Sequence, residues 1–214
     1  MILNKLELDI NQINELADAA PFMVQNSIPT MVVCPDLATQ AIIEKANNAG
    51  KYSIIIQLGW DKQSKEGLEK FNGLDISSLN CDGFEILVKG KSENEIREEI
   101  IAMCDFIYSV VSPTSDIRFI LNQEQLESIK QIPGNKYIIR NSIKTKCKQS
   151  ESNRETYKQF VEDITKLGYL PKLAGNISSA KMINILSAHK YAVNMKQAKT
   201  IVREYKEFER LLLK

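Results

Sequence analysis

The stretch that decides the fold is TMVVCPDLATQAIIEKANNAGKYSIIIQLGW, residues 30–60. It contains two short apolar runs, TMVVC (30–34) and YSIIIQL (52–58), with a helical pattern between them. Runs of this length that are rich in β-branched residues are typical of buried strands. Two such strands joined through a helix are expected to lie parallel in one sheet.

The same alternation of apolar runs and helical patterns continues along the chain. The other runs are ILNKLEL (2–8), GFEILVK (83–89), IRFILN (117–122), KYIIRN (136–141), LPKLAG (170–175) and KYAVN (190–194). Helical spacing of apolar residues is clearest in 153–167 and 195–213. This pattern predicts a closed (β/α)8 TIM barrel that forms a single domain over residues 1–214. An open doubly wound sheet is the alternative, but the sequence lacks the Gly-rich phosphate loop that usually follows its first strand.

Composition excludes several classes of partner. The 214 residues include 28 basic and 27 acidic side chains, for a net charge of +1, so no global field attracts nucleic acid or an anionic membrane. No apolar run approaches the roughly 20 residues that span a bilayer. The first residues lack the features of a signal peptide. We therefore expect a soluble, cytoplasmic protein that binds neither nucleic acid nor membranes.

The metal-binding residue types are few and scattered. The four cysteines form no C-x-x-C pair, and His189 is the single histidine of the sequence. A zinc site needs several such ligands at close spacing. We expect no metal site.

Barrels of parallel strands carry their active sites at the carboxyl ends of the strands. Polar residues near the ends of the predicted strands are therefore the first candidates for chemistry. These candidates are Asn4, Gln57, Glu85, Lys89, Asn122, Arg140, Asn141, Lys172 and Asn194.

Lys172 stands inside an apolar strand, immediately before a glycine-containing turn. A lysine that loses hydration favours its neutral form, and a neutral amine can attack a carbonyl to form a Schiff base. The alternative is a charged ammonium that pairs with a carboxylate or with carbonyl groups in the barrel mouth.

Glu85 and Lys89 lie on one predicted strand, and their spacing gives them the same side-chain direction. If both point inward, they form a buried ion pair or an acid and base pair. If the direction is reversed, both point outward among the helices and have no role in the site.

The stretch NKYIIRNSIKTKCK, residues 135–148, predicts a sixth strand that ends by presenting Arg140. The loop expected after it carries Lys144, Lys146 and Lys148. These lysines could hold a phosphate group, although an ordinary solvated loop has the same composition.

Three segments of the chain resemble the class I deoxyribose-phosphate aldolase family. MVVCPDLATQAIIEKANNAGKYSIIIQLGW (31–60) is similar to the second strand, helix and third strand of that family. NCDGFEILVKGKSENEIREEI (80–100) is similar to its Gly-Ala-Asp-Glu-Ile-Asp-Met-Val-Ile-Asn segment, and LPKLAGNI (170–177) to its Val-Lys-Ala-Ser-Gly-Gly-Ile segment.

The resemblance implies an aldehyde lyase that works through a lysine Schiff base, with no metal and no cofactor. The family joins acetaldehyde to glyceraldehyde 3-phosphate, so the expected partner is a small aldehyde or phosphosugar. A homodimer is a further expectation.

The resemblance also assigns roles to residues of this chain. Lys172 corresponds to the assisting lysine, and Glu85 corresponds to the catalytic aspartate of the fourth strand. Lys89 replaces the asparagine that closes that strand. Arg140 falls on the Schiff-base lysine of Phe-Val-Lys-Thr-Ser-Thr-Gly, and a guanidinium stays protonated and cannot serve as that amine.

The phosphate-binding turns of the family are altered in this chain. Its Gly-Gly pair becomes Gly175-Asn176, and its last-strand Gly-Thr-Ser-Ser becomes AVNM (192–195). The residues expected to bind substrate or phosphate are Gly175, Asn176, Asn194, Asn122 and Asn141.

The sequence therefore favours an enzyme, a divergent aldolase with Lys172 or Lys89 as the nucleophile. Glu85 would shuttle protons, and Arg140 would supply a fixed positive charge. Two alternatives stay open. One is an inactive barrel that serves as a binding or interaction module, and the other is a phosphosugar lyase or isomerase that uses Glu85 without a covalent step.

Overall fold

The computed structural model describes residues 2–59, 81–110, 116–121, 125, 142–146, 154–166, 170–174, 177 and 179–212. Its strands are β1 (Leu6–Ile10), β2 (Thr30–Val33), β3 (Ser53–Gly59), β4 (Gly83–Leu87), β5 (Asp116–Leu121), β6 (Ser142–Lys146), β7 (Leu170–Ala174) and β8 (Lys190–Val193). Its helices are α1 (Ile13–Asn26), α2 (Ala38–Asn47), α4 (Glu93–Val110), α6 (Arg154–Lys166), α7 (Ala180–Leu186) and α8 (Met195–Leu212). Two 3-10 turns, Leu3–Lys5 and Pro35–Leu37, precede β1 and α2.

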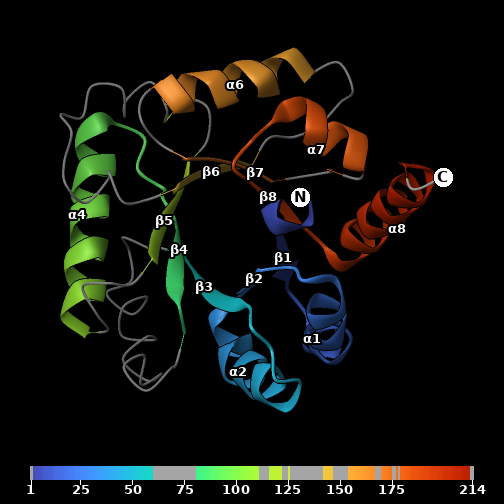
Figure 1. Ribbon diagram of the computed structural model, residues 1–214. Helices are drawn as coiled ribbons and strands as arrows, with labels where there is room; N and C mark the ends of the chain where they lie inside the picture. The colour runs from blue at the N-terminus through green and yellow to red at the C-terminus, as the bar shows by residue number, and fades with distance from the viewer. Residues whose placement is uncertain are drawn as a thin grey trace.

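The strands form a closed barrel in the order β1 to β8, and every neighbouring pair is parallel. Pairing of β1 with β8 closes the sheet, and the helices surround it (Figure 1). The predicted TIM-barrel fold is confirmed. None of the helices in the described part of the chain combines the length and apolar character needed to cross a bilayer.

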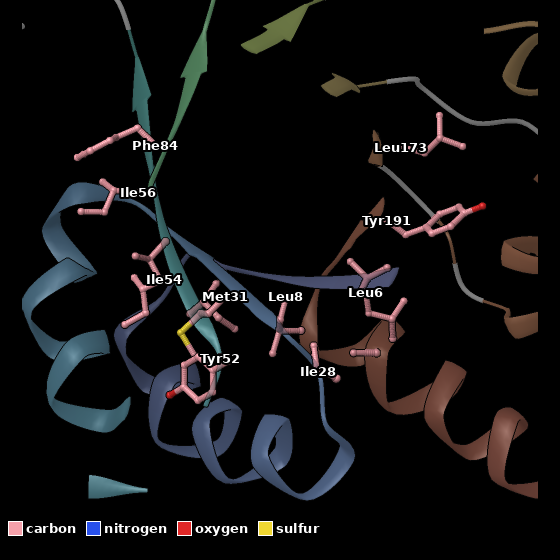
Figure 2. Close-up of a cluster of buried hydrophobic side chains, with 14 of the residues drawn as sticks. Leu6, Leu8, Ile28, Met31, Tyr52, Ile54, Ile56, Phe84, Leu173 and Tyr191 are labelled. Carbon is pink, nitrogen blue, oxygen red and sulfur yellow. The ribbon is translucent and has the colours of Figure 1, made fainter. Parts of the chain in front are cut away.

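Apolar side chains fill the layer between the barrel and its helices. Alternate residues of the strands point into this layer, because successive side chains of a strand face opposite sides. Figure 2 shows part of it, with Leu6 and Leu8 of β1, Met31 of β2, and Ile54 and Ile56 of β3. All five are buried. Packing in this layer holds the helices against the barrel. The alternate residues on the other face of each strand point into the barrel interior.

The inner face of the barrel is polar. Glu7 of β1, Glu85 of β4, Arg118 of β5 and Lys172 of β7 are all buried and contact one another in pairs. The two strands of each contacting pair are not neighbours in the sheet, so the paired side chains can meet only across the interior. TIM-barrel interiors are more often filled by branched aliphatic side chains. The charged interior therefore positions the candidate site.

Two predicted strands differ from the observed ones. The first strand begins at Leu6, and Asn4 lies in the preceding turn, at the amino side of β1. The sixth strand of the barrel is Ser142–Lys146, whereas the sequence predicted it at 136–141. Lys144 and Lys146 are therefore strand residues, and their prediction as loop residues is wrong. Lys148 and the predicted strand 136–141 lie outside the described residues.

Candidate active site

Lys172 lies at the centre of the polar interior. Its side chain is completely buried in the middle of β7. The ammonium Nζ lies 2.5 Å from Oε1 of Glu85, and it also pairs with the carboxylate of Glu7. The prediction that Lys172 lies in the barrel interior agrees with this placement. Of the two forms considered for Lys172, the contacts match the charged ammonium.

Glu85 points inward from β4, but its partner is not Lys89. The second oxygen of its carboxylate, Oε2, accepts a hydrogen bond from Nε2 of Gln57 at 3.0 Å. Gln57 and Glu85 are register partners on the adjacent strands β3 and β4. The two oxygens of Glu85 are therefore bound to different groups, a buried cation and a neutral amide.

Glu7 and Arg118 complete the cluster. Nη1 of Arg118 donates to Oε1 of Glu7 at 2.7 Å, and its Nε donates to Oδ2 of Asp116 at 2.6 Å. Glu7 is fully buried, and the Arg118 side chain is 10% exposed. A hydrogen bond between a guanidinium and a carboxylate is among the stronger polar contacts in proteins. Glu7 is therefore held by two cations, Lys172 and Arg118.

Glu7 and Arg118 were not among the predicted site residues, although Glu7 is the next-to-last residue of the predicted strand 2–8. A signal was nevertheless present. Each is a charged residue that interrupts an apolar strand, as Lys172 does. Their opposite charges on strands of one barrel indicate a shared interior.

Electrostatics keep Glu7 and Arg118 charged. Burial on its own raises the pKa of Glu7, but the Lys172 and Arg118 cations lower it by more, so the pKa lies below its ordinary value. Burial on its own lowers the pKa of Arg118, and the carboxylates of Glu7 and Asp116 raise it by more. Glu7 and Arg118 therefore carry their charges at neutral pH.

Lys89 lies in the exposed segment that follows β4. Its backbone N–H donates to the buried carboxylate of Glu99 at 3.1 Å, and the N–H of Gly90 donates to the same carboxylate at 2.8 Å. Nε2 of Gln125 donates to the carbonyls of Val88 and Gly90. Hydrogen bonds to backbone groups therefore fix the segment at the carboxyl end of β4, and the Lys89 side chain faces solvent.

Asn194 follows β8 and begins α8. Its Oδ1 accepts from the backbone N–H of Gln197 at 2.9 Å, and Oε1 of Gln197 accepts from the N–H of Asn194 at the same distance. This reciprocal pair is the capping-box arrangement of a helix amino terminus. The Asn194 side chain is exposed and caps α8.

The other predicted site residues, Arg140, Asn141, Asn122, Gly175 and Asn176, lie outside the described residues. The bounds of β6 nevertheless change the interpretation of Arg140. It precedes the strand by two positions, whereas the prediction put it at the carboxyl end. On β6 the residue in register with Lys172 of β7 is Lys144, which is also in register with Ile120 of β5, and on β8 it is Lys190.

The cluster can move protons. It combines carboxylates with an ammonium in direct contact, away from bulk water, and such groups serve as general acids and bases. Within the part of the chain that the structure describes, no group of three histidine, cysteine, aspartate or glutamate side chains could hold a metal ion.

Comparison with known proteins finds similarity in structure but not in sequence. No family model matches this chain, and no curated protein matches it. The tetrameric deoxyribose phosphate aldolase from Aeropyrum pernix superposes with a TM-score of 0.72 at 10% identity, over 97% of this chain and 92% of that one.

Two further solved structures extend the comparison. One is described as QR15, an aldolase, with a TM-score of 0.69 at 14% identity over 99% of this chain and 98% of that one. The other is a citrate lyase from Burkholderia xenovorans, with a TM-score of 0.64 at 7% identity over 95% of this chain and 77% of that one. Identity this low establishes the fold alone. The chain has the fold of the TIM-barrel aldolases and related lyases.

Proposed function

We propose that this chain is a lyase of the class I aldolase type, which cleaves or joins a small sugar, sugar phosphate or aldehyde through a lysine Schiff base. The observation that carries the proposal is the buried ammonium of Lys172 between the carboxylates of Glu7 and Glu85.

Such a cluster is a poor choice for stability alone. Replacement of a buried ion-pair network by well-packed apolar residues is often neutral or stabilising, by about 1–4 kcal/mol. An apolar interior would therefore hold the barrel together at least as well. The presence of the network in a fold that catalyses lyase reactions elsewhere supports a chemical role for it.

The choice of the nucleophilic amine follows from the contacts of Lys172. A Schiff base forms from a neutral amine, and the Lys172 ammonium is engaged by two carboxylates. Lys89 lies beyond the end of β4 and faces solvent. The amine we propose is Lys144 of β6, since its backbone is in register with that of Lys172.

The family resemblance supports the same assignment once β6 is located. With the strand at Ser142–Lys146, the Val-Lys-Thr of the family's Schiff-base segment can be matched to Ile143-Lys144-Thr145. The earlier match put the arginine at 140 in that place. The lysine that this chain was expected to lack is then present two positions inside β6.

In the cleavage direction, the amine of Lys144 adds to the substrate carbonyl carbon, and loss of water gives a protonated Schiff base. A base then removes the proton of the β-hydroxyl group, the carbon–carbon bond breaks, and its electron pair moves into an enamine as an aldehyde leaves. The enamine takes a proton at carbon, and water releases the product. Glu85 and Lys172 are suited to accept and return these protons because they are in direct contact.

Residues after β5, β7 and β8 would bind the rest of the substrate. These are the predicted Asn122, Gly175, Asn176 and Asn194, whereas the predicted Asn141 immediately precedes β6 and is given no role. The capping bonds of Asn194 use its backbone N–H and its Oδ1, so the hydrogens on Nδ2 could donate to a substrate. Arg140 is assigned no catalytic role in this proposal.

A screen of retro-aldol activity against phosphorylated and plain sugars tests the function. Lys144→Met and Lys172→Met should each lower kcat by at least about a hundredfold, whereas Lys89→Met should change it by less than about tenfold. Activity that survives Lys144→Met and Lys172→Met but not Glu85→Gln would instead indicate a non-covalent lyase or isomerase. Absence of turnover with every substrate would favour the binding-module alternative.

A further inference from the structure

Two lysines bridge the amino ends of β1 and β8, the strands whose pairing closes the barrel (Figure 1). Nζ of Lys5, the residue before β1, donates to the carbonyl of Ala188 at 3.3 Å. Nζ of Lys190, the first residue of β8, donates to the carbonyl of Asn4 at 3.0 Å. Each ammonium therefore lies against the backbone segment that carries the other lysine.

His189 adds a third basic side chain at the same end of the barrel. Its backbone N–H donates to the carbonyl of Pro171 at 3.0 Å, which fixes the segment before β8 against β7. Burial lowers the pKa of the His189 imidazole, and the neighbouring cations Lys190 and Lys5 lower it further. The imidazole therefore lies within the field of both ammonium groups. We call Lys5, His189 and Lys190 the amino-mouth cluster.

The carboxylates that act on this cluster are already engaged by other cations. Glu7 and Asp116 favour the charged form of Lys190. Glu7 is buried between two cations of the interior, and Asp116 is bound to Arg118 at 2.6 Å. Among the residues that the structure describes, Lys5 and Lys190 form no ion pair, and the acceptor of each ammonium is a backbone carbonyl. The cluster therefore lacks a counter-ion of its own.

We propose that the amino-mouth cluster binds a phosphate group, either as free phosphate or as part of a phosphorylated small molecule. An ammonium has three donors, and one carbonyl bond leaves the others for a ligand. The interior cations Arg118 and Lys172 add to the positive field at Lys190, which is half-buried. An anion at this place offsets repulsion among basic groups that are already partly removed from water. Phosphate fits because it carries roughly two negative charges and several strong acceptor oxygens.

This binding site goes beyond the proposed lyase function, because it lies at the opposite end of the barrel from the proposed substrate residues. Lys190 begins β8, whereas Asn194 follows the carboxyl end of the same strand. Phosphate binding at the amino end can therefore be measured without any turnover.

The protein supplies its own probe for the test, because His189 is the single histidine of the sequence. Protein labelled with 13C-histidine is titrated with inorganic phosphate at constant pH, with chloride added to keep the ionic strength equal. The pKa of His189 is then measured with and without saturating phosphate. A second arm uses glycerol phosphate in place of inorganic phosphate, which distinguishes a phosphorylated small molecule from the free ion.

The variants Lys190→Met and Lys5→Met each remove one ammonium of the cluster. Lys45→Met is the matched control, because it removes an ammonium that pairs with Asp82 and lies outside the cluster. Folding of each variant is checked by circular dichroism, and if one cluster variant does not fold, the other decides.

We expect the His189 resonance to shift in a saturable way at millimolar phosphate, and the pKa of His189 to rise by at least about half a pH unit. The dissociation constant should increase at least about tenfold in Lys190→Met and in Lys5→Met, and it should stay unchanged in Lys45→Met. Tighter binding of glycerol phosphate would assign the site to a phosphorylated small molecule, and equal binding would assign it to the phosphate group alone.

A shift that does not saturate, a shift that chloride reproduces, or equal phosphate affinity in the wild-type protein and the cluster variants would overturn the proposal. These outcomes do not depend on catalysis, so they remain distinct from failure of the lyase assignment.

Discussion

The ammonium of Lys172 and the carboxylate of Glu85 lie 2.5 Å apart in the barrel interior, although 87 residues separate them in sequence. The contact joins β7 to β4 across the barrel, with both side chains completely buried. It connects the stability of the fold to the proposed chemistry, because the two groups that pair in the interior are the ones to which the proposal gives the proton transfers.

Removal of Lys172 is expected to destabilise the protein strongly. Lys172→Met leaves the buried carboxylates of Glu7 and Glu85 without their shared cation, which should lower the free energy of unfolding by about 3–5 kcal/mol. Lys45→Met is the control, since its pair with Asp82 is more exposed, and it should cost about 0–1 kcal/mol. Urea denaturation measures both. Similar small losses of unfolding free energy in the two variants would show that the buried ion pair contributes no more to stability than the exposed one.

Stability should fall in acid partly through Glu7. Its pKa in the folded protein lies below the ordinary value of 4.5, because Lys172 and Arg118 outweigh the effect of burial. The folded state thus binds fewer protons than the unfolded state, so this contribution is complete above pH 4.5 and is lost as pH falls through the lowered pKa.

The measurement is the free energy of unfolding as a function of pH, for wild-type protein and Glu7→Gln. The wild-type curve should fall more steeply than the variant curve below about pH 5. Parallel curves would contradict the charged state assigned to Glu7.

Glu99 should matter more than Glu95 for the segment that carries Lys89. The buried carboxylate of Glu99 accepts the N–H groups of Lys89 and Gly90, and the exposed carboxylate of Glu95 accepts those of Lys91 and Ser92.

Glu99→Ala removes the buried carboxylate that accepts the partly buried N–H groups of Lys89 and Gly90, which should cost about 1–3 kcal/mol in unfolding free energy and speed amide hydrogen exchange at both residues. Glu95→Ala should cost about 1 kcal/mol or less, because water replaces an exposed partner. A larger cost for Glu95→Ala would mean that burial does not decide the strength of these bonds.

Local patterns predicted the barrel but only part of its interior. The alternation of strands and helices is encoded in short local segments, so these segments were enough to predict the fold. Lys172 could be predicted as an interior residue because it is a charged residue within an apolar strand. Glu7 and Arg118 were not recognised, because their partnership exists only after β1 and β5 close around the same interior. The contact between Glu7 and Arg118 joins residues that are 111 positions apart in the sequence.

The sixth strand was misplaced for a related reason. SIKTK (142–146) carries polar residues at alternate positions, and this pattern resembles a solvated loop unless the barrel interior is known to be polar. The apolar residues of YIIRN made 136–141 the more obvious strand. The polarity of the interior is a property of the whole sheet, so no single segment could reveal it.

The most direct test of the proposed Schiff-base chemistry is borohydride reduction of the protein with small aldehydes and sugar phosphates, followed by mass mapping of the modified peptide. Reduction converts a Schiff base into a stable secondary amine at the reacting lysine. We predict a substrate-dependent adduct on Lys144, abolished in Lys144→Met and retained in Lys89→Met. An adduct on Lys172, or none with any aldehyde, would contradict it.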